Sequence, residues 1–262
     1  MKVSEKTKIL IFDIETPLLK AYIWDCGDQV VRHDQLVPGW DQFNIICIAY
    51  KWSHEKKIHV LHWDYDSQDS SGMIEEFDKI VEQADIIVGK NSNKFDIKMV
   101  NGVRFLKGLK PFPQWAASKS DIEVQCRKHF RFPSQSLEYL AKNLGMGGKD
   151  KMERQDWINI QEKTADGPKA FKKMLRYCVR DVKLTDELLK RLDEYIISDL
   201  NSNDFSRDGL VCRLITCGSS DIIKNGTRIV KRRLMQRYHC NTHNGYAGLG
   251  AVNKDGNVTR IM

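Results

Sequence analysis

The sequence Lys8-Ile-Leu-Ile-Phe-Asp-Ile-Glu-Thr16 decides how the rest of the chain is interpreted. The unbroken apolar run from Ile9 to Phe12 is typical of a strand buried on both faces. Asp13 and Glu15 follow it two positions apart, so on a strand they share one face. Neighbouring carboxylates repel each other unless a cation lies between them, and hard divalent ions prefer oxygen ligands. The stretch predicts a metal site; the alternative is a strand end at which one acid caps a turn.

Acidic residues recur in two later segments. The apolar stretch at 85–89 predicts a short strand, and Asp96 follows it at the start of a helical pattern, where it either faces the same cleft or serves as a helix N-cap. A long helix is expected from about residue 168 to about residue 200. Within it, Tyr177 and Asp181 stand one turn apart on one face. The alternative for Asp181 is a solvated acid or an ion pair with Arg180 or Lys183.

The order of the patterns predicts the fold class. The stretches 43–52 and 57–62 are rich in β-forming residues and are separated by a polar turn, which indicates a hairpin beside the first strand. Helical spacing at 72–84 then leads into the strand at 85–89. Strands followed by alternating helix and strand indicate an α/β fold, with a mixed β-sheet flanked by helices.

Three motifs carry a resemblance to a known family. F-D-I-E-T at 12–16, N-S-N-K-F-D at 91–96 and Y-C-V-R-D at 177–181 resemble, in order and spacing, the motifs of the DEDD 3′→5′ exonuclease superfamily. A Tyr four residues before the last Asp is typical of its DEDDy branch. The resemblance covers roughly residues 8–195 and is closest to phage-type and stand-alone relatives of the exonuclease domain of family B DNA polymerases.

The resemblance implies an RNase H-like fold and a metal-dependent 3′→5′ exonuclease that acts on nucleic acid 3′ ends, with single-stranded DNA favoured. It implies that two Mg²⁺ or Mn²⁺ ions are held by Asp13, Glu15, Asp96 and Asp181. Tyr177 would orient or help to deprotonate the attacking water, and Thr16 and Asn91 would contact the substrate. Lys90 departs from the His of many relatives. An exoribonuclease and a catalytically silent nucleic-acid-binding or recruitment module remain the alternatives.

The positive charge of the chain is concentrated near its end. Residues 201–262 carry ten Lys and Arg against four Asp and Glu, a net charge of +6 out of +7 for the whole chain. Such an excess is typical of a surface that binds a polyanion, and nucleic acid is the usual one. The densest basic run is expected to contact phosphates, although a solvated face is the alternative; it comprises Lys224, Arg228, Lys231, Arg232, Arg233 and Arg237.

The same segment resembles the zinc ribbons of nucleic-acid-binding proteins. Cys212, Cys217, Cys240 and His243 would hold one structural Zn²⁺ as a Cys3His set, with His239 as a competitor for the fourth position. The spacing of the first pair is C-x4-C, and the alternative is a set of free thiols in a small β-appendage. We expect an exonuclease domain over 1–200, a zinc-ribbon-like segment over 206–250 and a tail over 251–262.

The chain is 41% hydrophobic, which allows a substantial core over 262 residues. It contains no apolar stretch that approaches a membrane span, and its polar start is unlike a signal peptide. Single, scattered cysteines at 26, 47, 126 and 178 are typical of small buried side chains in a reducing compartment. An intracellular location, without secretion, is therefore expected.

Overall fold

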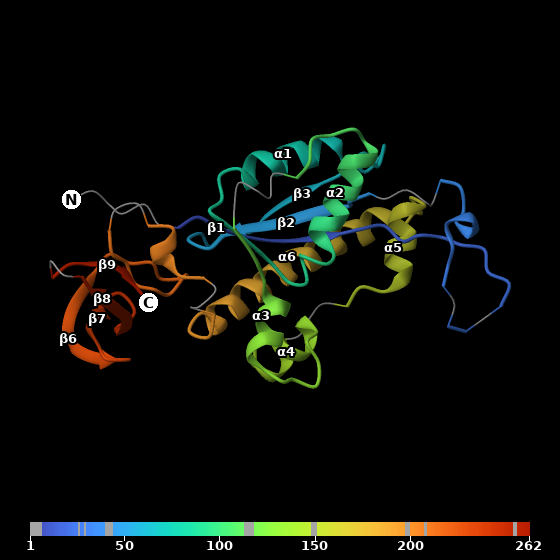
Figure 1. Cartoon of the computed structure of the whole chain (residues 1–262). Helices are drawn as coiled ribbons and strands as arrows, with labels where there is room; N and C mark the ends of the chain where they lie inside the picture. Colours follow the sequence, from blue (N-terminus) through green and yellow to red (C-terminus); the bar gives the residue numbers. More distant parts are fainter. Residues whose placement is uncertain are drawn as a thin grey trace.

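The structure is a computed structural model that describes residues 7–25, 27–28, 30–39, 44–112, 118–147, 151–196, 200–206, 209–253 and 256–262. Figure 1 shows a central sheet with helices on both faces and, at one end of the molecule, a separate sheet formed by the C-terminal segment. The predicted architecture, a mixed sheet flanked by helices with a small C-terminal appendage, is confirmed.

The central sheet has five strands in the order β3-β2-β1-β4-β5. The middle strand β1 pairs antiparallel with β2 and parallel with β4, and β2 pairs antiparallel with β3 as the predicted hairpin requires. Residue 43, at the start of that prediction, lies outside the described residues. The strands are β1 (Ile9–Glu15), β2 (Cys47–Trp52), β3 (His59–His62), β4 (Ile86–Gly89) and β5 (Ser118–Asp121).

The alternation of side chains along β1 divides the core into two layers. Leu10, Phe12 and Ile14 pack with α1 and α2 on one face of the sheet. Ile9 and Ile11 pack on the other face with α6, and Asp13 and Glu15 continue that side of the strand. The helices are α1 (Ser71–Val81), α2 (Asp96–Leu106), α3 (Ile122–His129), α4 (Leu137–Asn143), α5 (Arg154–Gln161) and α6 (Gly167–Leu192), with short 3-10 turns η1 (His33–Gln35) and η2 (Ser202–Asp204).

The long helix α6 begins with Pro168 in its first turn, as expected, but ends at Leu192 and not near residue 200. Just beyond this end, the buried carboxylate of Asp193 accepts hydrogen bonds from the amides of Ile215 (2.8 Å) and Thr216 (2.9 Å). Residues 197–199 of the predicted helix lie outside the described residues.

The C-terminal segment forms a four-stranded antiparallel sheet in the order β6-β7-β8-β9. The last strand lies beyond residue 250, so the sheet does not stop at the predicted boundary, and the division into domains stays a prediction. Ile215 packs into the core beside α6, which joins this sheet to the rest of the protein. The strands are β6 (Ile222–Val230), β7 (Arg233–Cys240), β8 (Gly245–Val252) and β9 (Val258–Ile261).

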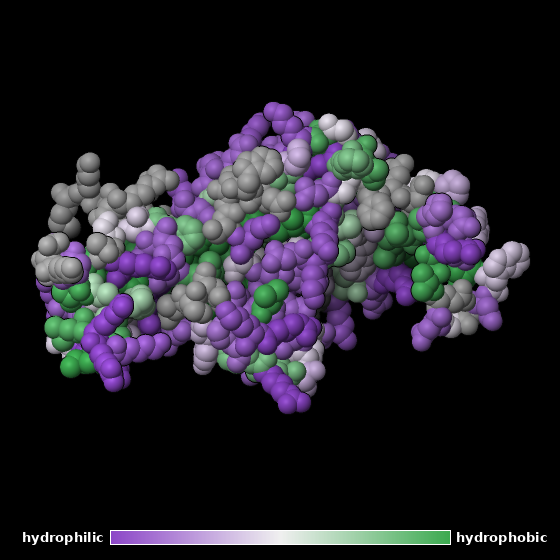
Figure 2. Space-filling model, in the orientation of Figure 1, coloured by the Kyte–Doolittle hydropathy of each residue, from purple (hydrophilic) through white to green (hydrophobic). Residues whose placement is uncertain are grey.

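Hydrophilic residues cover most of the face drawn in Figure 2. Hydrophobic residues come to the surface there in several separate patches, among them one over the C-terminal sheet and one over the segment that follows β1. None of the helices that the structure describes is both long and apolar enough to cross a membrane.

Candidate active site

The candidate site lies at the carboxyl end of β1. Asp13 and Glu15 face the α6 side of the sheet and are half-buried, opposite Ala49 and Cys47 of β2. Ligand atoms of Asp13, Glu15 and Cys178 all lie within 4.8 Å of one another. The strand therefore presents its two carboxylates together, as its alternating pattern predicts.

Cys178 is the member of this group that the sequence does not single out. Its Sγ lies 3.5 Å from the backbone oxygen of Asp13 and 3.8 Å from Oδ2 of the same residue. Burial raises the pKa of the Cys178 thiol well above its ordinary value, so the group stays protonated and donates to Asp13. The carboxylate oxygens, and not a thiolate, are thus the anionic ligands that this cluster offers to a cation.

Asp96 contacts the same strand, β1, from the helix that follows β4. It is the first residue of α2, and its Oδ1 accepts a hydrogen bond from the amide of Ile14 at 3.2 Å. No side-chain capping bond is formed at the start of α2, so Asp96 does not serve as the N-cap of the alternative reading. Burial raises the pKa of Asp96 to about 7, and the charge of Asp121 adds to this effect.

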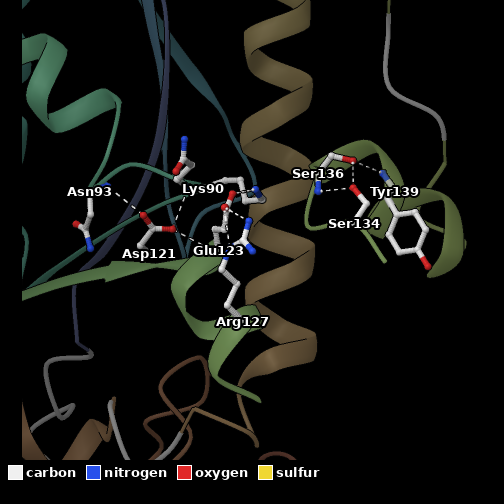
Figure 3. A network of polar contacts seen from close by, with 9 residues as sticks. Lys90, Asn93, Asp121, Glu123, Arg127, Ser134, Ser136 and Tyr139 are labelled. Carbon is white, nitrogen blue, oxygen red and sulfur yellow. Dashed lines mark hydrogen bonds and ion pairs between the residues drawn. The ribbon is translucent and has the colours of Figure 1, made fainter. Parts of the chain in front are cut away.

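The turn between β4 and α2 is held by Asp121, which is the N-cap of α3. Its buried carboxylate accepts from the amides of Asn91 (2.9 Å), Asn93 (3.0 Å) and Glu123 (2.8 Å). Figure 3 shows this network together with the ion pair between Lys90 and Glu123, whose atoms lie 2.6 Å apart. Asn91 adopts a left-handed backbone conformation with φ 62°, which Asn tolerates better than most residues. These contacts fix the backbone that leads into Asp96.

The middle of α6 carries Tyr177 and Asp181. Asp181 is 5% exposed, so it is not the solvated acid of the alternative reading. The ring of Tyr177 meets Trp157 of α5 edge-on at 6.4 Å between centroids. Trp157 in turn donates its Nε1–H to the backbone oxygen of Thr16 at 3.1 Å. Tyr177 is therefore linked through one aromatic residue to the segment that follows Glu15.

Not all the predicted carboxylates meet in this structure. Asp13 and Glu15 converge, whereas Asp96 and Asp181 are not members of the group whose ligand atoms lie within 4.8 Å. Asp96 is attached to the backbone between the two, at Ile14. The acidic cluster at the end of β1 can hold a divalent metal ion, because its oxygen donors suit Mg²⁺ or Mn²⁺.

A second candidate metal centre lies in the C-terminal segment. Cys212, Cys217, Cys240 and His243 place ligand atoms within 4.8 Å of one another, and His239 is not part of the group. Sγ of Cys212 lies 3.6 Å from Nδ1 of His243, and Sγ of Cys217 lies 3.7 Å from Sγ of Cys240. A hydrogen bond with Cys212 lowers the pKa of Cys217 to about 5, while that of Cys212 is raised. Three sulfurs and one imidazole nitrogen are a donor set that can bind zinc.

The basic run lies on the hairpin formed by β6 and β7. Lys231 and Arg232 form its two-residue turn with φ of 48° and 64°, the left-handed conformations of a type I′ turn. Four further basic side chains flank the turn along both strands: Lys224, Arg228, Arg233 and Arg237. With Lys231 and Arg232 they make six exposed cations. The hairpin therefore presents its cations to solvent.

No protein-family model and no curated protein matches the chain. Among solved structures, the chain is similar to the family B DNA polymerase from the hyperthermophilic archaeon Pyrobaculum calidifontis, with 18% sequence identity and a TM-score of 0.54. The match covers 76% of this chain and 26% of the polymerase chain, so the present chain corresponds to about a quarter of that protein. At this identity the likeness concerns the fold.

Proposed function

We propose that the protein is a metal-dependent 3′→5′ exonuclease that hydrolyses the phosphodiester bonds of nucleic acid, with single-stranded DNA as the favoured substrate. The observation that carries this proposal is the convergence of Asp13 and Glu15 at the end of β1, with Asp96 bonded to the amide between them. A fold shared with a family B DNA polymerase adds support.

The metal-binding role falls to Asp13, Glu15, Asp96 and Asp181. Two divalent cations held there would stabilise the charge that develops on the attacking and leaving oxygens during phosphodiester hydrolysis. The raised pKa of Asp96 fits this role, because burial of a carboxylate beside other acids is costly and a cation offsets that cost. The neutral thiol of Cys178 supports the position of Asp13 from behind.

Tyr177 is assigned the role of orienting the attacking water or helping to deprotonate it. It stands one turn before Asp181 and its ring rests against Trp157, which limits the directions in which its hydroxyl can point. From that position it orients the water or helps to remove its proton. Two residues are assigned to contacts with the substrate strand. Thr16 follows Glu15 directly in the sequence, and Asn91 lies in the turn that Asp121 holds.

The C-terminal sheet is assigned to nucleic acid binding. A structural zinc ion at Cys212, Cys217, Cys240 and His243 would hold the strands of a segment that has a small apolar core of its own. The six exposed cations of the β6–β7 hairpin would bind the phosphate backbone and increase affinity without base preference.

The test is a degradation assay with matched DNA and RNA oligomers labelled at either end. In Mg²⁺ or Mn²⁺, the 5′-labelled strand should yield a ladder of shortening products, and the 3′-labelled strand should release a labelled mononucleotide at once. The DNA-to-RNA rate ratio assigns the substrate. If the protein binds both oligomers but shortens neither with either metal, it is the binding module of the alternative and the proposal is wrong.

A further inference from the structure

A pocket of about 600 Å³ lies between α3, α4 and the C-terminal part of α6. Aromatic rings form much of its wall, among them Phe132 and Tyr139, together with Tyr195 just beyond the end of α6. Its size is within the range of small-molecule and nucleobase sites. None of the residues assigned to hydrolysis lines it.

The aromatic rings of the pocket are held in place by each other. Phe130 stacks on Phe132 with centroids 5.1 Å apart and meets Tyr195 edge-on at 4.9 Å. Phe132 and Tyr195 nevertheless remain 38% and 55% exposed. Flat faces that are both ordered and open to solvent are what a stacking ligand requires.

The polar groups of the pocket match a nucleotide. Arg191 is the one charged residue among the described residues that line it, and no acid accompanies it there. The structure shows no ion pair between Arg191 and any described residue. Asn143 donates its amide hydrogen to the backbone oxygen of Tyr139 at 2.8 Å, which leaves Oδ1 as an acceptor. A cation for phosphate and an acceptor for a base edge thus stand beside the rings.

The pocket lies along the helix that carries the candidate site. Leu188, in its wall, follows Asp181 by seven residues, so both lie on the same face of α6, about 10 Å apart along its axis. The loop after α4 contacts α6 beside Asp181, since Arg180 donates to the backbone oxygen of Met146 at 3.3 Å. The pocket and Asp181 are therefore both placed by α6, about two helical turns apart along the chain.

We infer that this pocket stacks bases of a single-stranded nucleic acid, a few nucleotides from the end that is cleaved. Phe132 and Tyr195 provide the stacking faces, and Arg191 binds an adjoining phosphate. This inference rests on the proposed function for its choice of ligand. It adds a site that is separate from the metal-binding carboxylates and from the basic hairpin.

The experiment measures binding without added divalent ion, so that no strand is cleaved. Fluorescence anisotropy compares a single-stranded oligomer with an abasic oligomer of the same length. The double variant Phe132→Ala, Tyr195→Ala should bind the base-bearing oligomer about tenfold or more weakly and the abasic one unchanged. Tyr195→Phe should retain wild-type affinity, as should Tyr22→Ala, which removes an exposed aromatic ring far along the chain from the pocket.

Equal affinity of the double variant and the wild type for the base-bearing oligomer would overturn the inference, and so would an equal loss on both oligomers. If the double variant unfolds, the Arg191→Gln variant provides the test. It should lower the affinity for both oligomers alike and lower the salt slope of binding by about one. An unchanged slope would overturn the inference. Because binding is read without turnover, an intact binding pattern with no cleavage would refute only the proposed function.

Discussion

Asp96→Asn should stabilise the metal-free protein increasingly as the pH rises. In the folded state burial holds the pKa of Asp96 at about 7, against 3.8 for an ordinary aspartate. Well below pH 3.8 the carboxyl is protonated in both the folded and the unfolded state and carries no penalty. As the pH rises toward 7, the Asp96 carboxyl ionises in the unfolded chain but stays largely protonated in the folded protein. The wild type therefore loses stability over that pH range. The Asp96→Asn variant loses no stability in this way, because asparagine does not ionise, and its Oδ1 can still accept a hydrogen bond from the amide of Ile14.

The size of the effect follows from the pKa difference. About 1.4 kcal/mol for each pH unit gives a full penalty of roughly 4 kcal/mol above pH 7, of which roughly 2 to 3 kcal/mol develops between pH 5 and pH 8. For a protein of this size that change corresponds to roughly 5 to 10 °C in Tm. The variant should therefore gain about this much over the wild type when the pH is raised from 5 to 8.

The assay is thermal unfolding of both proteins by circular dichroism at several pH values, after dialysis into buffer without divalent ions. The difference between the two proteins at each pH cancels contributions that they share, such as the state of the C-terminal cysteines. Adding Mg²⁺ at pH 8 should then stabilise the wild type more than the variant, because the cation offsets the buried charge of Asp96. A difference in Tm that stays constant or shrinks as the pH rises would show that Asp96 carries no buried charge in the folded protein.

Three further predictions follow from the site and the C-terminal sheet. Tyr177→Phe should lower kcat by roughly tenfold to a thousandfold with little change in metal affinity; an unchanged kcat in single-turnover assays would mean that the ring serves packing alone. The purified chain should retain about one zinc ion after dialysis, and Cys217→Ser should lose it, as measured by elemental analysis; zinc-free wild type prepared under reducing conditions would contradict the Cys3His assignment. The triple variant Arg228→Gln, Lys231→Gln, Arg232→Gln should lower the salt slope of binding by up to about three, whereas Lys56→Gln with Lys57→Gln, exposed in the turn before β3, should leave it unchanged; equal slopes would contradict the role of the hairpin.

Local patterns sufficed for the elements around the candidate site. The alternation along β1 predicted that Asp13 and Glu15 share a face, and they converge there because Ile9 and Ile11 point into the same core layer. The spacing of Tyr177 and Asp181 on a helix was equally clear, because periodicity alone determines it.

What the sequence did not reveal depends on contacts between distant segments. Cys178 read as one more apolar position of α6, and only the packing of α6 on β1 places its thiol 3.8 Å from Asp13 Oδ2. Just beyond the end of α6, Asp193 bonds to Ile215 and Thr216, more than twenty residues away, and no local pattern predicts that contact. Strand β9 lies in the stretch predicted as a tail. Gly248 and Gly250 of β8 leave room for it, since a Cβ there would lie 2.1 Å from Ile261 and 2.0 Å from Val258.

The most direct test of the central claim compares the wild type with Asp13→Asn on one 5′-labelled oligomer. Mg²⁺ should support progressive shortening from the 3′ end by the wild type. The variant should lose turnover by at least a thousandfold, because Asp13 holds the cation, while its fold and its affinity for the oligomer stay near those of the wild type. Shortening by the variant at a rate close to that of the wild type would contradict the assignment of the carboxylates at the end of β1 as the catalytic metal site.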